Sequence, residues 1–253
     1  NDPSLLKDFY GSMIVPMANF LTEFVDQSTG LPKPSYDLWE EYYMVTTYST
    51  AVTYAALLAA SDLAGIAGDD SHAVQWRTAA DDIKTAAEKH LFNEERNTFY
   101  KGIFTDNHRF DKDTTIDASA IFGASLFGLF ESDSPKLTAA VKTLKEAFTY
   151  SQQRPGLPRY ENDPYRRTSD DVSGNWWFIS SLWHAQYLIE EGNEAEAISI
   201  LDWTKAHALT TGMLGEQVNP TDETSVAPAP LTWSHAEYIS TILDLIDRRT
   251  RRG

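Results

Sequence analysis

The chain has 253 residues and no cysteine. This excludes a disulfide framework and thiolate catalysis, but it leaves the compartment open between extracellular and cytoplasmic, because secreted proteins can also lack disulfides. The six histidines are scattered, without the short spacing that is typical of metal ligands. We therefore expect neither a metal site nor a cofactor, and we assign no role to these residues: His72, His90, His108, His184, His207 and His235.

Positive charge is also scarce, since 21 Lys and Arg stand against 37 Asp and Glu and give a formal net charge of -16. Nucleic acids and anionic membranes are bound by concentrated basic faces, so we expect neither as a partner. The basic run from Arg248 to Arg252 is interpreted as a helix end followed by a tail. A neutral ligand such as a carbohydrate is compatible with the acidic charge.

Long apolar runs and repeats are missing as well. Residues 14–25 are interrupted by Pro16, Asn19 and Glu23 and are too short to cross a bilayer, so neither a membrane span nor a signal peptide is predicted. No short motif recurs at a fixed interval, which disfavours a solenoid. With 42% hydrophobic residues, the chain can bury a large core and is expected to be soluble and globular.

Apolar residues recur at helical spacing along most of the chain. Helix-start signals occur at Ser134, at Asn193 with Glu196 and at Ser234 with Glu237, and Gly68 is a helix-stop signal. Residues 4–10 are interpreted as the tail of a helix, and residues 93–115 as a long loop with one short hairpin. The predicted helices cover about residues 16–25, 45–68, 71–91, 116–130, 134–148, 176–191, 193–203 and 234–246.

Mostly apolar helices alternate with amphipathic ones in this pattern. The alternation predicts an all-α fold of about eight helices, with an inner and an outer ring. A helical bundle or a solenoid would show the same alternation, so the pattern alone does not choose among them.

The most unusual connection is GLPKPSYDLWEEYYMVTTYST, residues 30–50. It combines the aromatic residues Tyr36 and Trp39 with the carboxylates Asp37, Glu40 and Glu41. Aromatic rings provide surfaces on which a sugar can stack, and adjacent carboxylates repel each other, which favours the protonated form that a general acid needs. The alternative is a helix N-terminus, where acidic residues face the macrodipole and the Trp only packs.

Three stretches resemble the glucoamylase family, glycoside hydrolase family 15, in the order found there. YDLWEE, residues 36–41, resembles its general-acid loop. Residues 156–183, GLPRYENDPYRRTSDDVSGNWWFISSLW, are similar to its Arg-Tyr, Asp-x-Tyr and Asn-Pro-Trp-Phe segment. Residues 212–235, GMLGEQVNPTDETSVAPAPLTWSH, resemble its general-base loop and the Leu-Thr-Trp-Ser that follows. Together they cover nearly the whole chain.

The resemblance implies an (α/α)6 barrel of the six-hairpin glycosidase type. Only one full helix and a helical tail are predicted before Glu40, so residues 1–253 are expected to form the C-terminal two thirds of a single catalytic domain, as an incomplete barrel. The missing N-terminal part of the same domain is then an expected partner. Without it the sugar subsite would be incomplete, and the fragment alone is expected to be inactive.

By the same resemblance, Glu40 is the general acid and Glu216 the general base of an inverting reaction. Glu41 and Arg159 would bind sugar hydroxyls. Further substrate-binding residues implied by the matched segments are Tyr36, Leu38, Trp39 and Trp177.

Each of these residues also has a purely structural interpretation. Glu216 would be a loop carboxylate, and Glu41 a salt-bridged glutamate at a helix start. Arg159 would pair with Glu161 or Asp163. Trp177 would fill the core at the start of an apolar helix. Asp117, which opens another apolar helix, is interpreted as a cap.

The implied activity is exo-acting release of β-glucose from the non-reducing ends of α-glucans. Hydrolysis of α-1,6 glucans or of trehalose is the nearest alternative, and a non-catalytic glucan-binding or regulatory module, or a plain structural helical domain, are the others. Tyr42, Met44 and Thr46 follow the acid where many prokaryotic members have a basic residue, a Gly and a His. Trp176 replaces the Pro of the Asn-Pro-Trp-Phe segment, and Gly215 precedes the base. These departures bear on substrate preference.

Overall fold

Helices connected by short antiparallel strands make up most of the protein. The computed structural model describes residues 8–105 and 110–252. Within these residues a π-helical turn, η1 (Tyr10–Ile14), precedes eight α-helices. The helices are α2 (Val15–Glu23), α3 (Thr47–Ala67), α4 (Asp70–His90), α5 (Ala118–Leu126), α6 (Pro135–Ala147), α7 (Phe178–Glu190), α8 (Glu194–Ala206) and α9 (Thr232–Arg252).

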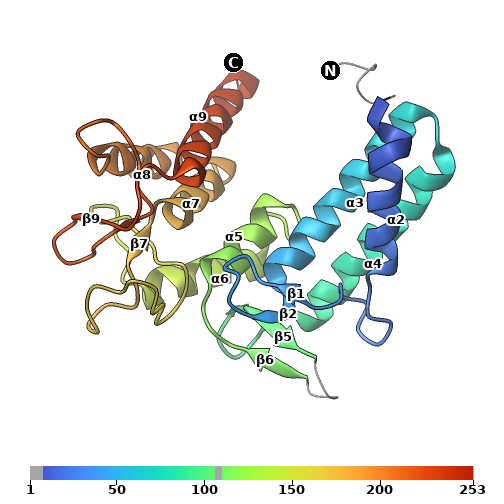
Figure 1. The fold of residues 1–253 in the computed structure, drawn as a ribbon, viewed down its shortest axis with the longest axis horizontal. Coiled ribbons are helices and arrows are strands. Elements are labelled where there is room, and N and C mark those ends of the chain that lie inside the picture. The colour runs from blue at the N-terminus through green and yellow to red at the C-terminus, as the bar shows by residue number, and fades with distance from the viewer. Residues whose placement is uncertain (1–7, 106–109, 253) are drawn as a thin grey trace.

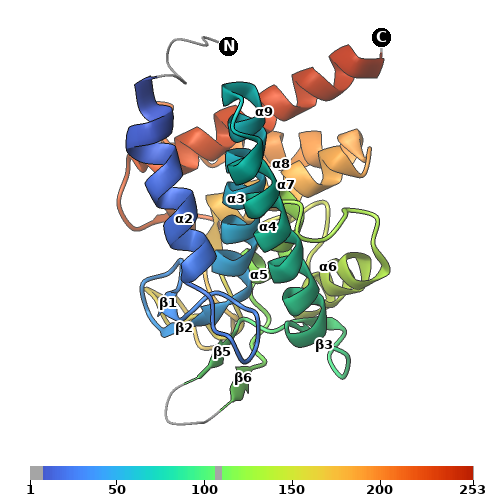
Figure 2. The same ribbon diagram turned by 90° about the vertical axis from the view of Figure 1, so that its right-hand side faces the viewer.

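The helices form two layers. In the inner layer α3 packs on α5, α5 on α7 and α7 on α9, and each of the first three also packs on the outer helix that follows it, α4, α6 or α8. Figure 1 shows the inner helices as an arc that ends at α3 on one side and α9 on the other, and Figure 2 shows α2 and α4 beside α3. This arrangement of inner and outer helices is an incomplete (α/α)6 barrel, which confirms the predicted fold.

Three of the inner helices, α3, α5 and α7, have sequences with almost no polar face, whereas α9 is amphipathic. Every residue of α7 from Phe178 to Ile189 is buried. In α3, small residues such as Ala51 and Ala64 are fully buried and allow close packing. Gly123 of α5 serves the same purpose, since a Cβ atom there would lie 2.6 Å from the Tyr48 ring.

By length and composition alone, α3 is apolar enough to cross a membrane. No membrane span was predicted at these residues from the sequence. In the structure its apolar side is packed against α4 and α5, which accounts for the same composition.

Most predicted helix ends are confirmed. Gly68 ends α3 in the left-handed conformation with φ 77°. Ser134 and Asn193 cap α6 and α8 by accepting hydrogen bonds from Leu137 N and Glu196 N. The predicted cap at Ser234 is wrong, because α9 already begins at Thr232 and the buried Ser234 hydroxyl donates to the Gly215 carbonyl at 2.7 Å.

The strands were largely unforeseen. Instead of one hairpin in residues 93–115, the structure has two antiparallel pairs, and one of them joins a sheet of order β1-β2-β5-β6. The pairing of Val45 with Ile103 is distant in sequence, so local patterns do not predict it. The strands are β1 (Ser35–Tyr36), β2 (Tyr43–Thr46), β3 (Phe92–Asn93), β4 (Thr98–Phe99), β5 (Gly102–Phe104), β6 (Asp111–Asp113), β7 (Trp176–Trp177), β8 (Gln217–Val218) and β9 (Ser225–Val226).

Two further predictions are affected. The helix predicted from residue 176 begins at Phe178, because Trp176 and Trp177 form β7 and pair with Val218 and Gln217. Residues 4–7 of the predicted helical tail, and His108, lie outside the described residues.

Candidate active site

The loop that carries Glu40 connects β1 to β2 and is closed by Asp37. Asp37 N donates to Tyr42 O at 2.8 Å, and the Asp37 carboxylate accepts from Glu41 N at 2.7 Å and from Tyr42 N at 3.2 Å. Helix α3 starts only at Thr47, where Thr46 is the N-cap. The alternative that these acidic residues begin a helix is therefore wrong, since they form a hairpin loop.

Glu40 occupies a costly position in this loop. Its φ of 59° is in the left-handed region, and its N donates to Asp37 O at 3.1 Å. A non-glycine residue in that conformation costs about 1 kcal/mol or more, and such residues cluster at functional sites. The Glu40 side chain is exposed, and across residues 8–105 and 110–252 it makes no hydrogen bond or ion pair. The loop thus presents a carboxyl group that the protein itself does not use.

Trp39, the neighbour of Glu40, fastens the loop to the inner helices. The indole is buried, and its Nε1 donates to the Asp117 carboxylate at 3.0 Å. Its ring centroid lies 6.0 Å from those of Trp177 and Trp183 and 6.2 Å from that of Trp233. Because Trp183 belongs to α7 and Trp233 to α9, the Glu40 loop is fixed against the far end of the arc.

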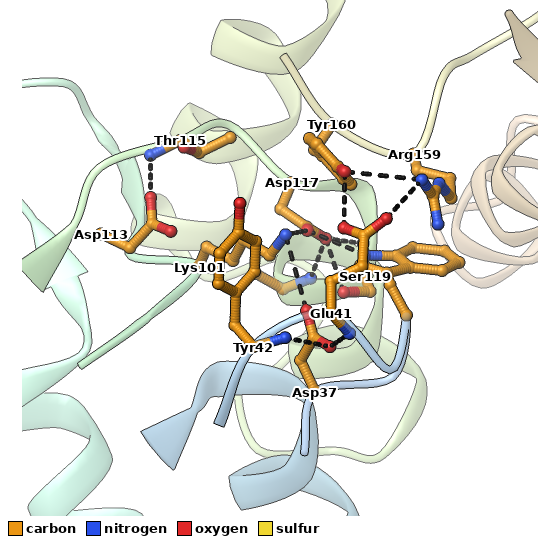
Figure 3. Close-up of polar contacts among 12 residues, drawn as sticks. Asp37, Glu41, Tyr42, Lys101, Asp113, Thr115, Asp117, Ser119, Arg159 and Tyr160 are labelled. Atoms are coloured by element: carbon orange, nitrogen blue, oxygen red, sulfur yellow. Dashed lines mark hydrogen bonds and ion pairs between the residues drawn. The ribbon is translucent and has the colours of Figure 1, made fainter. Parts of the chain in front are cut away.

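Arg159 connects the middle segment of the chain to the same loop. Its guanidinium donates to both carboxylate oxygens of Asp163 at 2.7 Å and to Glu41 at 2.9 Å. The Tyr160 hydroxyl donates to the other Glu41 oxygen at 2.5 Å. Figure 3 shows Glu41 between Arg159 and Tyr160. The guanidinium also lies 4.8 Å from the Trp177 ring centroid.

These contacts decide between the structural alternatives for the two residues. Arg159 does pair with Asp163, whereas Glu161 pairs with Arg96 at 2.8 Å. Glu41 is salt-bridged, but in the loop and not at a helix start. Burial disfavours the charged form of Arg159, yet the hydrogen bond and charge of Asp163 and the charge of Glu41 outweigh it and raise its pKa above the ordinary value.

Glu216 immediately precedes β8. Gln217 pairs with Trp177 in the antiparallel ladder, and Phe178 N donates to the Glu216 carbonyl at 3.4 Å. Burial raises the pKa of the half-buried Glu216 carboxyl above its ordinary value. The rise is limited by the Gln217 amide, which donates to the carboxylate at 3.0 Å, and by the positive charges of Arg166 and Arg159.

Both candidate carboxyl groups therefore belong to segments that contact Trp177. Trp39 touches its ring from the Glu40 side, and Gln217 pairs with its backbone on the Glu216 side. Trp177 is the N-cap of α7, and Trp39 is bound to Asp117, the N-cap of α5. The two segments therefore meet at the N-terminal ends of these inner helices.

The remaining predicted residues are less closely grouped. Tyr36 is 66% exposed on β1 and packs edge-on against Tyr43, with ring centroids 5.5 Å apart. Leu38 is half-buried against the hydrophobic core. Trp177 is buried, as its structural alternative expected. The structure thus brings together Trp39, Glu41, Arg159 and Trp177, while Tyr36 pairs with a neighbour on the hairpin.

Two contributors to the site were not predicted from the sequence. Asp117 caps α5 as expected, through Ser119 N at 2.7 Å, but it also holds Trp39. Lys101 lies 3.6 Å from the carboxylates of both Asp37 and Asp117. No spacing rule marks Lys101, because only the pairing of distant strands brings it to the loop.

Trp176 stands where the family has Pro, and its ring packs against Gly156 in the segment that leads to Arg159. A Cβ atom on Gly156 would lie 2.2 Å from the Trp176 ring, so only glycine permits this approach. The ring is covered on another side by Arg154, whose guanidinium is 4.7 Å from its centroid. Among the residues that the structure describes, no three His, Asp or Glu side chains are grouped so as to hold a metal ion.

An open arc of paired helices with acidic loops at the inner N-termini is the architecture of a helical-barrel glycosidase. The chain belongs to glycosyl hydrolases family 15, whose family model matches residues 21–199. It is 26% identical over 243 residues to an uncharacterized glycosyl hydrolase of Methanocaldococcus jannaschii, covering 91% of this chain and 36% of that protein. It is 25% identical to a trehalase of Mycolicibacterium smegmatis, covering 79% of this chain and 28% of the trehalase.

Among solved structures, a bacterial glucoamylase complexed with acarbose superposes with a TM-score of 0.77 at 20% identity. The superposition covers 95% of this chain and 38% of the glucoamylase, and at this identity it establishes the fold alone. The chain spans about a third of the length of the curated relatives it matches.

Replacing Arg159 with Met should lower the free energy of unfolding by about 3–5 kcal/mol, because Asp163 would stay buried without its cation. Urea denaturation measures the loss. Arg96→Met is the matched control: its pair with Glu161 is more exposed, with side-chain exposures of 37% and 24%. We expect a loss of about 1 kcal/mol there. Equal losses in the two variants would show that the buried Arg159–Asp163 pair stabilises the fold no more than the more exposed Arg96–Glu161 pair.

Proposed function

We propose that the protein is an inverting, exo-acting glycoside hydrolase that releases β-glucose from the non-reducing ends of α-glucans. The observation that supports this best is the approach of the Glu40 and Glu216 segments to Trp177. Inversion needs two carboxyl groups on opposite sides of the scissile bond, roughly 6.5–9.5 Å apart, so that a water fits between one of them and the sugar.

In this mechanism Glu40 donates its proton to the glycosidic oxygen as the bond to the anomeric carbon breaks. Glu216, as carboxylate, accepts a proton from the water that attacks the same carbon from the opposite face. The water oxygen becomes the hydroxyl group of the product, whose configuration is inverted from α to β. Both carboxyl groups return to their starting states after one proton exchange with solvent.

The choice of Glu40 over its neighbours follows from what each carboxylate already binds. Asp37 is engaged by two backbone N–H groups and lies beside Lys101, and Glu41 is held by Arg159 and Tyr160. Their charges are compensated, so they serve less as repelling neighbours than the sequence suggested. Glu40 is left as the carboxyl group that can reach a ligand.

Substrate binding is assigned to the grouped residues around the acid. Trp39 and Trp177 form an aromatic wall, and Arg159 with Glu41 would offer donors and acceptors to sugar hydroxyls. We also propose Tyr36 and Leu38 as substrate-binding residues, because they lie in the same hairpin as Trp39. A sugar that reaches Arg159 has to share it with Asp163 and Glu41, because the guanidinium is already hydrogen-bonded to both.

Linkage specificity is open to one specific alternative, trehalose, because trehalases are among the relatives. A panel of maltooligosaccharides, isomaltose, dextran and trehalose, tested on the complete catalytic domain, separates the two. Cleavage of trehalose alone would replace α-glucans as the proposed substrate while keeping the same acid and base. Binding of acarbose without turnover of any of them would favour a glucan-binding module instead.

In the complete catalytic domain, Glu40→Gln and Glu216→Gln should each lower kcat at least about 100-fold, because each removes a proton-transferring group. Glu223→Gln is the control, since this exposed carboxylate lies nearby in the turn between β8 and β9 and pairs with Arg154. Proton NMR of the first product should show the β-anomer. Undiminished turnover by Glu216→Gln, or initial release of α-glucose, would reject the assignment.

The pH dependence gives a second test. The Gln217 amide donates to the Glu216 carboxylate and stabilises its charged form. Gln217→Met removes this hydrogen bond and should therefore raise the pKa of Glu216 further. Because the base must be ionised, the acidic limb of the kcat/KM profile should move to higher pH. Thr168→Val perturbs the same polar network through Asn175 without touching Glu216, and should leave the limb in place. An unmoved limb in Gln217→Met would argue against Glu216 as the base.

We further propose that residues 1–253 are the C-terminal part of a single catalytic domain, and that the remaining helices pack against two exposed apolar stripes. The α2 stripe consists of Met17 and Phe20 of α2 and Met13 of the preceding η1 turn, which are 61%, 57% and 47% exposed. The α9 stripe consists of Ile239, Leu243 and Ile246, which are 57%, 55% and 52% exposed.

Each stripe follows the spacing of one helix face, and Figure 1 places α2 and α9 at opposite ends of the arc. The relatives are about three times as long as the matched region, so they have chain to supply such helices. Amphipathic helices that close the ring would cover both stripes.

Leu243→Lys should weaken association with the polypeptide that carries the remaining helices by about 10- to 100-fold, the value of one buried leucine. Val74→Lys is the control, because Val74 is 68% exposed on the outer helix α4. Titration of the labelled polypeptide gives the affinities. Equal affinities, or burial of the stripes in a dimer of this chain instead, would contradict the proposal.

A further inference from the structure

Lys101 is a buried cation at the base of the Glu40 loop. It lies between β4 and β5 and is 3% exposed. Its backbone N donates to Asp113 O at 3.0 Å, and its carbonyl accepts from Thr47 N at 3.2 Å. The backbone of Lys101 is thereby fixed between the β5–β6 hairpin and the start of α3.

The ammonium group stands between the two carboxylates that hold the loop. Asp37, 3.6 Å away, accepts from Glu41 N and Tyr42 N and so fixes the loop backbone. Asp117, also 3.6 Å away, accepts from Trp39 Nε1 and fixes the loop side chain. Figure 3 shows Lys101 between these two anchors.

A third anchor is reached through Tyr160. The ammonium lies 3.8 Å from the centroid of the Tyr160 ring, while the Tyr160 hydroxyl donates to Glu41. Cation–π contact and two ion pairs therefore connect one side chain to three of the groups that hold the loop, Asp37, Asp117 and Tyr160. Within the described residues Lys101 makes no hydrogen bond or ion pair with Glu40 itself, so its effect on the acid passes through the loop.

Charge balance makes this connection strong. Asp37 and Asp117 are both buried, at 5% and 0% exposure, and two buried carboxylates close to one cation would repel each other without it. The remaining oxygen of Asp37 has no hydrogen-bond donor among the described residues, so the ammonium is the group that compensates it. Loss of Lys101 would release Asp37, and with it the strained backbone at Glu40.

We propose that Lys101 is the positioning residue of the general acid, which it holds in place through Asp37, Asp117 and Tyr160. This rests on the proposed function, in which Glu40 is the acid. A catalytic group must lie within hydrogen-bond reach of the proton it transfers, and displacement by about 1 Å costs about 100-fold in rate. Lys101 would thus affect the rate without touching the sugar.

The test compares two substrates in the complete catalytic domain. Maltose needs a proton on its leaving oxygen, whereas the fluoride of α-glucosyl fluoride leaves with little protonation. Lys101→Met should lower kcat on maltose about 100-fold, leave KM within about threefold, and lower kcat on the fluoride less than about tenfold. Lys112→Met is the matched control, because this lysine of β6 stacks on Tyr100 outside the network. Trehalose replaces maltose if the panel selects it.

A second measurement is independent of catalysis. Amide hydrogen exchange at Glu41 and Tyr42 should become at least about tenfold faster in Lys101→Met, because both amides donate to Asp37, while amides of α7 stay unchanged. If Lys101→Met does not fold, Lys101→Arg is measured in the same way. It keeps the charge, but its larger head group should displace Asp37.

The outcomes separate the two proposals. Equal losses on both substrates, or unchanged exchange at Glu41 and Tyr42, would overturn the role of Lys101. Inactivity of the wild type, or full activity of Glu216→Gln, would instead reject the hydrolase function. The exchange result would still decide whether Lys101 holds the loop.

Discussion

The site depends on the burial of one indole, that of Trp39. Its ring packs among Trp177, Trp183 and Trp233, and its N–H is bound to Asp117. A hairpin loop at one end of the arc is thereby joined to the start of α5 and to the helices at the other end. Because Glu40 is the next residue, its position is set by this packing and by the loop backbone, in which Glu40 N donates to Asp37 O. The Glu40 side chain can therefore stay without a hydrogen bond or ion pair among the described residues.

Electrostatics around the loop follow from that burial. Lys101 and Arg159 are both buried cations, and each stands among carboxylates that would be costly to bury alone. The sequence suggested that the carboxylates of residues 37–41 repel each other, but they differ in what they bind. Asp37 and Glu41 are paired with these cations, whereas the Glu40 side chain makes no ion pair among the described residues.

The sequence predicted the helices well, because helical periodicity and capping motifs are short-range properties. Of the predicted site residues, the structure brings together Trp39, Glu41, Arg159 and Trp177. Gly68, Ser134 and Asn193 mark helix ends through bonds to residues within five positions. Periodicity and capping motifs do not predict contacts between segments that are distant in sequence. Ser234 carries a capping signal but is bound to Gly215, and Trp177 opens an apolar run but pairs with Gln217. Lys101 was missed for the same reason, since its partners are far away in sequence.

The hydrogen bond from the Ser234 hydroxyl to the Gly215 carbonyl connects α9 to the segment of Glu216. It joins the first turn of α9 to the residue before Glu216. The exposed stripe lies farther along α9. A helix that packs on this stripe would therefore contact the same helix whose first turn is hydrogen-bonded to the backbone beside Glu216. If Glu216 is the base, as proposed, any displacement of the first turn of α9 would reach the backbone beside its carboxylate through this bond.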